Sequence, residues 1–360
     1  MGEMFKDLPA ALTATLDVAS QTEVELEFGT YHLPIFKSET GESPDAIFSR
    51  LLDEGLDKCY GKDCVAARER LEYEKATITE LGFVSYFLIV WDLIRWAREH
   101  GIHVGPGRGS AAGSIVAYLL DITRVCPLRY GLLFERFLNS ARVSMPDIDI
   151  DFCKDGRERV LQYTRDRYGE ENVAQIVTFG TMKSRTVVRD VGRVLEVPLK
   201  DIDRIAKNIP QGPGAPNLSA ALSSDPELKE FSKQPEFSEL FELSITLEGI
   251  TRHVSTHAAG VVIADRPIAE YVPLAKNGDD VTTQWQAPEL EDLGLLKMDY
   301  LGLRTLTIID GTLANVTRRG GSAPEIETLP LDDAATFALL LSGETQGVFQ
   351  LESDGMRKLI

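Results

Sequence analysis

An acidic residue stands at every second position of the stretch Pro146-Asp147-Ile148-Asp149-Ile150-Asp151-Phe152. Because successive side chains of a β-strand point to opposite faces, this alternation predicts a strand over residues 143–153 with one acidic and one apolar face. Carboxylates this close repel one another unless a cation lies among them, and their oxygens are the ligands that Mg²⁺ and Mn²⁺ prefer. Asp147, Asp149 and Asp151 are therefore candidate ligands of a two-metal site, and the alternative is a solvated acidic strand face.

A further metal ligand is expected from another strand. Asp299 is the one acid in an apolar run that predicts a strand over residues 294–300, and Lys297 shares its face. Asp299 would complete the metal site. The alternative is a structural ion pair between Lys297 and Asp299.

A glycine-rich loop, Gly107-Arg108-Gly109-Ser110, lies between a predicted short strand at 102–104 and a predicted small-residue helix that begins at Ser110. Glycines let backbone N–H groups approach an anion closely, and a helix start favours negative charge. Ser110 would either cap the helix or donate its hydroxyl to a phosphate. The spacing matches neither a P-loop nor a dinucleotide fingerprint. Next to an acidic strand, the loop predicts nucleotidyl transfer.

The composition sets broad limits on the class of protein. With 360 residues, 43% of them hydrophobic, the chain is long enough for two or three domains. A net charge of −18 argues against a basic surface throughout but leaves room for a basic cleft. The four cysteines lack zinc-site spacing and indicate reduced thiols in a cytoplasmic protein. No signal peptide is visible, and the apolar window at 83–94 is shorter than the ~20 residues of a membrane span.

Other segments predict a mostly helical chain around these strands. Apolar periodicity predicts helices over 6–20 and, as one long region, 45–100; arginine-rich helices are expected over 156–207. Residues 23–28 alternate like a short strand, and 210–216 form a Gly/Pro-rich linker. The sequence ends within an apolar-periodic pattern without a stop signal, so we expect a piece of a longer protein.

These motifs together resemble one family, the alpha (catalytic) subunit of bacterial replicative DNA polymerase III. The resemblance runs through nearly the whole chain and is carried by residues 105–114, 132–139, 143–153, 178–182, 257–263 and 297–305. It implies an α+β fold: a polymerase-beta-like nucleotidyltransferase palm, a mixed sheet with helices, into which a helical thumb is inserted. The implied domains are a connecting segment at 1–45, palm at 46–178 and 256–305, thumb at 179–255, and the start of the fingers at 306–360.

The resemblance also assigns roles to individual residues. It implies that Asp147, Asp149 and Asp299 bind two Mg²⁺ ions, with Mn²⁺ as a substitute, and that Asp151 has a supporting role. The incoming triphosphate would be held by residues of the glycine loop and of a later segment, with Lys297 nearby: Arg108, Gly109, Ser110 and Arg136.

The thumb-like segment contains a basic stripe. Arg185, Arg189 and Arg193 repeat at helical spacing after Lys183, so they would share one face. The stripe would contact the DNA backbone or, alternatively, form a solvated face paired with Asp190 and Glu196.

Two histidines near the end of that segment have the spacing of a helical zinc site. His253 and His257 are four residues apart, but no cysteine or glutamate stands where it would complete the site. The resemblance implies instead a loop in which His257 contacts nucleotide or primer.

The implied function is template-directed DNA synthesis from deoxynucleoside triphosphates on primer-template DNA in chromosomal replication. Implied partners of the parent protein are a sliding clamp and a proofreading exonuclease, with no membrane. The family's His-rich phosphoesterase-like domain and most of its fingers have no counterpart here, so the chain alone is expected to bind DNA weakly with little or no activity. The alternatives are a DNA-binding-only fragment and a template-independent nucleotidyltransferase.

Overall fold

The computed structural model describes residues 2–38, 40–61, 63–139, 145–212 and 214–360. The chain forms two compact units, which are described separately. Unit 1 comprises the chain up to Val173, Ala258–Tyr271 and Pro288–Ile360, and unit 2 comprises Ala174–His257 and Val272–Ala287.

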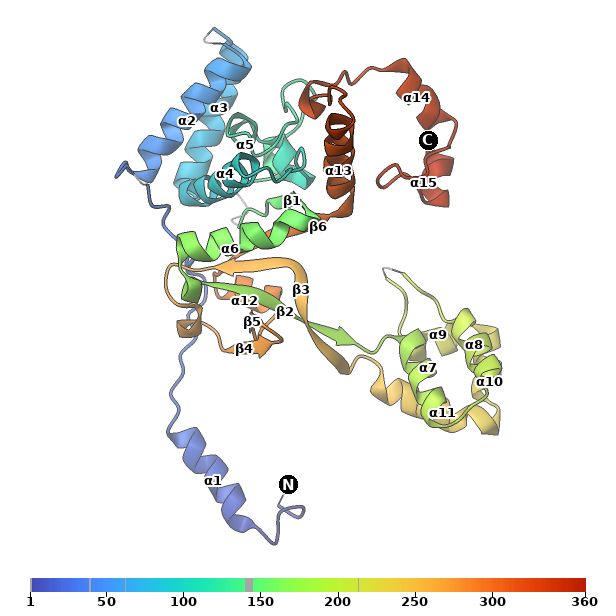
Figure 1. The fold of residues 1–360 in the computed structure, drawn as a ribbon. Helices are drawn as coiled ribbons and strands as arrows, with labels where there is room; N and C mark the ends of the chain where they lie inside the picture. Colours follow the sequence, from blue (N-terminus) through green and yellow to red (C-terminus); the bar gives the residue numbers. More distant parts are fainter. Residues whose placement is uncertain (1, 39, 62, 140–144, 213) are drawn as a thin grey trace. The chain divides into compact units, whose positions relative to one another are not determined.

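The described residues form helices of very different length (Figure 1). In chain order the α-helices are α1 (Pro9–Ser20), α2 (Pro44–Cys59), α3 (Val65–Glu80), α4 (Val84–Glu99), α5 (Ile115–Leu119), α6 (Arg157–Tyr168), α7 (Ser184–Val194), α8 (Leu199–Asn208), α9 (Leu218–Ser224), α10 (Pro226–Ser232), α11 (Pro235–Leu247), α12 (Ala287–Asp292), α13 (Arg304–Arg318), α14 (Ala334–Leu341) and α15 (Asp354–Leu359). Within the described ranges no single helix is long and apolar enough to cross a membrane; only the bent pair α3–α4 reaches that composition when taken together.

The strands form one mixed sheet with the order β1-β6-β3-β2-β5-β4. They are β1 (Asp149–Cys153), β2 (Val173–Thr181), β3 (Thr251–Ile263), β4 (Leu274–Asn277), β5 (Asp280–Thr283) and β6 (Leu296–Leu303). Strand β6 pairs parallel with β1 and antiparallel with the second half of β3. Helices α7 to α11 follow β2 and precede β3, so the predicted α+β class with a mixed sheet and a helical insertion is confirmed.

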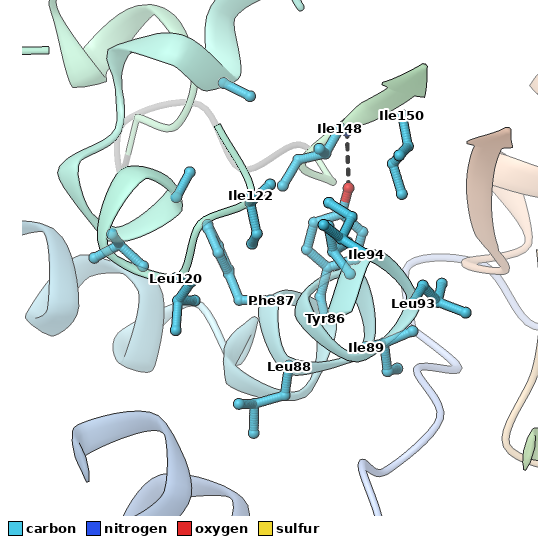
Figure 2. Packing of buried hydrophobic residues seen from close by; sticks show 14 of the residues in the cluster. Tyr86, Phe87, Leu88, Ile89, Leu93, Ile94, Leu120, Ile122, Ile148 and Ile150 are labelled. Atoms are coloured by element: carbon cyan, nitrogen blue, oxygen red, sulfur yellow. Dashed lines mark hydrogen bonds between the residues drawn. The ribbon is translucent and has the colours of Figure 1, made fainter. Parts of the chain in front are cut away.

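The core of unit 1 is built around α4, whose apolar residues are almost all buried. Figure 2 shows this helix between the loop that carries Leu120 and Ile122 and the segment that carries Ile148 and Ile150. Tyr86 is fully buried, and its hydroxyl accepts a hydrogen bond of 2.8 Å from the backbone N–H of Ile148. Ile148 stands between Asp147 and Asp149. The hydrogen bond from α4 therefore fixes the backbone between these two aspartates.

The core of unit 2 belongs to its helices. Val187, Val188 and Val191 of α7 are buried against α8 and α11, through Ile205 and Leu240 among others. Helix α7 is amphipathic, because its valines lie along one face. Its basic residues therefore lie outside the core.

Several predicted boundaries are wrong, for identifiable reasons. The strand expected over 143–153 begins only at Asp149: residues 143 and 144 lie outside the described ones, and Pro146 lacks the N–H that a ladder needs. The strand expected over 294–300 is shifted to Leu296–Leu303. Residues 23–28 form no strand, because all of them are exposed and no neighbouring strand pairs with them.

The helical predictions also need correction. The region 45–100 is three helices, with breaks at the poor helix formers Gly61 and Gly82. The region 156–207 is interrupted by β2, where β-branched valine and isoleucine favour a strand. The first helix begins at Pro9 rather than residue 6, and the expected strand 102–104 is a single bridge between Val104 and Phe152.

Replacing Tyr86 by phenylalanine should destabilise unit 1 by about 1–3 kcal/mol, because the buried Ile148 N–H loses its acceptor. Chemical denaturation can be followed by the fluorescence of Trp91 and Trp96 on the same helix. The control is Tyr130→Phe, a tyrosine that is 51% exposed, where the free energy of unfolding should stay within about 0.5 kcal/mol. Equal stability of the two variants would contradict the role given to the Tyr86 hydroxyl.

Candidate metal centre

Three carboxylates meet where β1 and β6 pair. The parallel register sets Asp149 of β1 opposite Asp299 of β6, and Asp147 lies two residues before β1 begins. One oxygen from each of the three lies within 4.8 Å of the others. Asp147 is exposed, Asp149 is half-buried and Asp299 is buried, so the group opens toward solvent on one side. Carboxylates in this arrangement can share a divalent cation.

Lys297 supplies the nearest positive charge. Its Nζ lies 3.1 Å from Asp299 Oδ2, 3.6 Å from Asp147 Oδ2 and 3.9 Å from Glu291 Oε1 of α12. The ion pair between Lys297 and Asp299, which was the alternative to a metal site, is therefore present. It uses only Oδ2 of the two carboxylate oxygens of Asp299. Among the described residues the other oxygen, Asp299 Oδ1, is buried and has no hydrogen-bond partner. A buried carboxylate oxygen without a partner is costly, and a cation held by the three aspartates would offset that cost.

The electrostatics of the group are those of crowded acids. Burial raises the pKa of Asp149, the charges of Asp147 and Asp299 raise it further, and Arg108 opposes them. Burial likewise raises the pKa of Glu291, which Lys297 partly offsets. For Lys297 burial lowers the pKa, yet Asp147, Asp299 and Glu291 together outweigh it and the net direction is upward. Lys297 therefore stays charged, and the acids around it still outnumber it, so the site attracts a cation.

Asp151 lies outside this group. Its carboxylate accepts two hydrogen bonds from Arg108: Nη2 lies 2.9 Å from Oδ1, and Nε lies 3.3 Å from Oδ2. The prediction that Asp147, Asp149 and Asp151 share one strand face is wrong for Asp147, which precedes the strand. Asp151 thus orients an arginine of the glycine loop.

The glycine loop packs closely against the chain that follows it. Gly107 has a φ of +111°, and a Cβ there would come within 2.8 Å of the Thr123 side chain. The backbone N–H of Arg124 donates to Pro106 O over 2.7 Å, which fixes the loop from the other side. Gly109 and Ser110 are exposed at its tip.

The helix expected from Ser110 begins later. Residues Gly109–Gly113 form a 3-10 turn, and α5 starts at Ile115. The N-cap of α5 is the buried Ser114, whose hydroxyl accepts from the Ala117 N–H. Ser110 therefore has no capping role, and its hydroxyl is left for another partner.

Arg136 ends the short 3-10 helix Phe134–Arg136 and is exposed. Phe134, two residues earlier, is fully buried and anchors this turn in the core of unit 1. Arg136 forms no ion pair with any residue that the structure describes, so its guanidinium is available to an anion.

Family models match nearly the whole chain. The "Bacterial DNA polymerase III alpha NTPase domain" matches residues 46–302, and the "Bacterial DNA polymerase III alpha subunit finger domain" matches residues 305–360. The chain belongs to the bacterial DNA polymerase III alpha family.

Relatives named DNA polymerase III subunit alpha are similar along the full chain. The Caulobacter vibrioides protein is 46% identical over 366 residues, which cover 99% of this chain and 32% of the relative. The Bacillus subtilis protein is 44% identical over 362 residues, covering 100% and 32%. The Pseudomonas aeruginosa protein is 44% identical over 378 residues, again covering 100% and 32%. The chain thus spans about a third of the length of these relatives. The resemblance and the polymerase-beta-like fold class that it implied are confirmed.

In this member of the polymerase III alpha family, the three arginines of the basic stripe of α7 bind groups within unit 2. Arg185 donates to the carbonyls of Lys207 and Ile209 at 3.1 and 2.8 Å, at the end of α8. Arg189 pairs with Asp203 at 3.1 Å, and Arg193 pairs with Asp190 at 3.6 Å. Lys183 is exposed just before the helix. The pairing with Asp190 was part of the alternative interpretation, and contact with DNA stays a prediction.

His253 and His257 lie on strand β3, and the loop expected around them is wrong. Four residues of strand span about 13 Å, so the two imidazoles cannot share a zinc ion. The β-branched residues along the strand, among them Val254, Thr256 and the run Val261–Ile263, favour it.

Sequence reasoning missed Tyr86 and Glu291. Tyr86 is one aromatic among many in an apolar helix, and nothing in the pattern distinguishes its hydroxyl. Glu291 stands among other acids of a short polar helix, and only the fold brings it to Lys297.

Replacing Asp149 by asparagine should stabilise the metal-free protein at pH 7. The folded state raises the pKa of Asp149, so proton binding favours folding below the ordinary value of about 3.9, and this contribution is lost as the pH rises through the folded pKa. Asparagine cannot ionise, so the variant should have the higher thermal midpoint at pH 7 with a chelator and no advantage at about pH 4.

The same variant should lose stabilisation by Mn²⁺, which binds the folded state and raises the midpoint of the unchanged protein. Asp53→Asn, at an exposed position of α2, is the control and should alter neither midpoint. A lower midpoint of Asp149→Asn in chelator, or an undiminished response to Mn²⁺, would contradict the account.

Proposed function

We propose that this chain carries the nucleotidyl-transfer centre of a template-directed DNA polymerase, which joins deoxynucleoside triphosphates to a primer 3′-hydroxyl in chromosomal replication. One observation carries the proposal: Asp147, Asp149 and Asp299 converge within 4.8 Å, and a buried oxygen of Asp299 lacks a partner among the described residues. Family membership supplies the class of reaction.

The three aspartates would hold two Mg²⁺ ions, with Mn²⁺ as a substitute. When bound, such ions stabilise the charge that develops on the attacking and leaving oxygens of an in-line displacement. The chain contributes the geometry, because the ladder between β1 and β6 fixes the separation of Asp149 and Asp299. Lys297 orients Asp299 and offers an ammonium to a phosphate that enters the site.

Four further residues would bind the triphosphate: Arg108, Gly109, Ser110 and Arg136. Asp151 keeps the planar guanidinium of Arg108 in one orientation, which lowers the entropy lost when that guanidinium binds a phosphate. Ser110 has no capping task and Arg136 no ion pair within the described residues, so both are free to bind an anion.

We propose the remaining assignments by analogy with the family. We place a connecting segment at 1–45, palm at 46–178 and 256–305, thumb at 179–255 and the start of the fingers at 306–360. Lys183, Arg185, Arg189, Arg193 and His257 would face primer-template DNA. Arg193 is more available than Arg189, because its side chain is 72% exposed against 48%. In the longer protein, the partners would be a sliding clamp and a proofreading exonuclease, in the cytoplasm.

In the full-length protein, Asp147→Asn should lower nucleotide incorporation by about 10³-fold or more, because a ligand of the reacting centre is lost. Circular dichroism should stay unchanged, since Asp147 is exposed. Asp53→Asn should retain normal incorporation. Normal incorporation by Asp147→Asn would refute the assignment of the metal ligands.

Template dependence is tested by primer extension with and without a template strand. Extension that needs the template and follows its sequence is the expected result. Equal extension of the primer alone would instead identify a template-independent nucleotidyltransferase, and DNA binding by the full-length protein without any extension would identify a binding-only protein.

A further inference from the structure

An ion pair on α3, between a partly buried arginine and a fully buried glutamate, holds together two separate segments of the chain. Arg70 Nε lies 2.6 Å from Glu74 Oε1, and their side chains are 20% and 0% exposed. Burying two charges costs free energy unless every polar atom finds a partner, so the contacts of this pair are informative.

Those contacts go to backbone and hydroxyl groups outside α3. Arg70 Nη2 donates to Gly113 O at 2.9 Å and to Leu132 O at 3.2 Å. Glu74 Oε2 accepts from Ser114 Oγ at 2.8 Å and from the Val116 N–H at 3.2 Å. The pair therefore ties one end of the glycine-loop segment to the start of the segment that leads into Phe134–Arg136.

The two segments touch directly beside the pair. A Cβ on Gly113 would come within 2.5 Å of Leu133 O, so only glycine permits this approach. Ser110 lies three residues before Gly113, and Arg136 lies four residues after Leu132. Both intervening stretches are compact 3-10 turns that pack on each other. The contacts of Arg70 and Glu74 thus determine how far Ser110 lies from Arg136.

Packing alone does not require charges at these positions. A buried ion pair can often be replaced by apolar residues of similar volume without loss of stability. What apolar residues cannot do is bind two carbonyls, a hydroxyl and an amide at fixed angles, which is the property that matters if the held segments carry ligands for a phosphate chain.

We propose that Arg70 and Glu74 are positioning residues for the nucleotide: they hold the glycine loop and the Arg136 turn at the spacing that lets Ser110 and Arg136 bind one triphosphate. This inference rests on the proposed function and extends it to residues remote from the metal centre. Neither residue touches the nucleotide.

The test is steady-state primer extension by the full-length protein. Arg70→Lys keeps the positive charge but loses the planar fork, so it cannot reproduce the bonds to Glu74, Gly113 and Leu132. We expect KM for the deoxynucleoside triphosphate to rise about tenfold or more, since a small displacement of a positioned group costs much of its binding. KM for primer-template and the affinity for Mn²⁺, measured by electron paramagnetic resonance, should stay unchanged.

The matched control is Arg50→Lys. Arg50 forms the same kind of pair with Glu54 on α2, at 3.1 Å, but the side chains are 47% and 60% exposed. Its other ion pair within the described residues, 3.5 Å to Glu42, is with the exposed stretch just before the same helix. This variant should leave every kinetic constant as it is. Glu74→Gln preserves the shape and serves as the second variant should Arg70→Lys fold poorly.

A double-mutant cycle separates positioning from a general structural role. If Arg70 acts through Arg136, then Arg70→Lys should change KM much less in an Arg136→Ala background than in the unchanged protein. Additive effects, an unchanged KM in both Arg70→Lys and Glu74→Gln, or parallel losses of nucleotide and Mn²⁺ affinity would each overturn the inference. An unchanged protein without template-directed incorporation would instead overturn the proposed function.

Discussion

The parallel pairing of β1 with β6 is the constraint on which the site depends. It sets Asp149 opposite Asp299, and these two residues come from parts of the chain that are distant in sequence. A slip of one residue would turn every side chain of the strand to the other face, sending the carboxylates into the core and the isoleucines to the site. The buried row of Ile150 and Phe152 makes that slip costly, so the apolar face fixes the positions of the acids.

The same arrangement brings carboxylates together so closely that their charges repel one another. Asp147, Asp299 and Glu291 surround Lys297, and the folded state raises the pKa of Asp149. Such crowding lowers stability in the absence of a cation and increases affinity for one, a trade-off that is common at functional sites. Lys297 offsets part of the repulsion while leaving one oxygen of Asp299 unpaired within the described part of the chain. Tyr86 and the β1–β6 ladder supply the stiffness that keeps the acids together.

The amino-acid sequence predicted the acidic residues of the site better than the strands and buried contacts that hold them in place. Alternation of acids and isoleucines marked Asp147, Asp149 and Asp151 alike, and the family resemblance then favoured the first two and added Asp299. Strand β2 was missed because its first half, Val173–Val177, is buried on both faces and lacks the alternation that marks a strand, so periodicity alone does not separate it from the helices on either side. The role of Arg70 and Glu74 could not be predicted, because their spacing is the same as that of the exposed pair Arg50–Glu54. Burial, which decides between the two, is a property of the fold.

The central claim is that Asp147, Asp149 and Asp299 form one metal centre. Its most direct test is a crystal structure of the protein soaked with Mn²⁺ and a deoxynucleoside triphosphate, with data collected at the manganese absorption edge. The expected result is anomalous density bounded by the carboxylates of all three aspartates, including Oδ1 of Asp299, the oxygen that has no hydrogen-bond partner within the described residues. Anomalous density elsewhere, or Mn²⁺ held by Asp147 and Asp149 without Asp299, would contradict it.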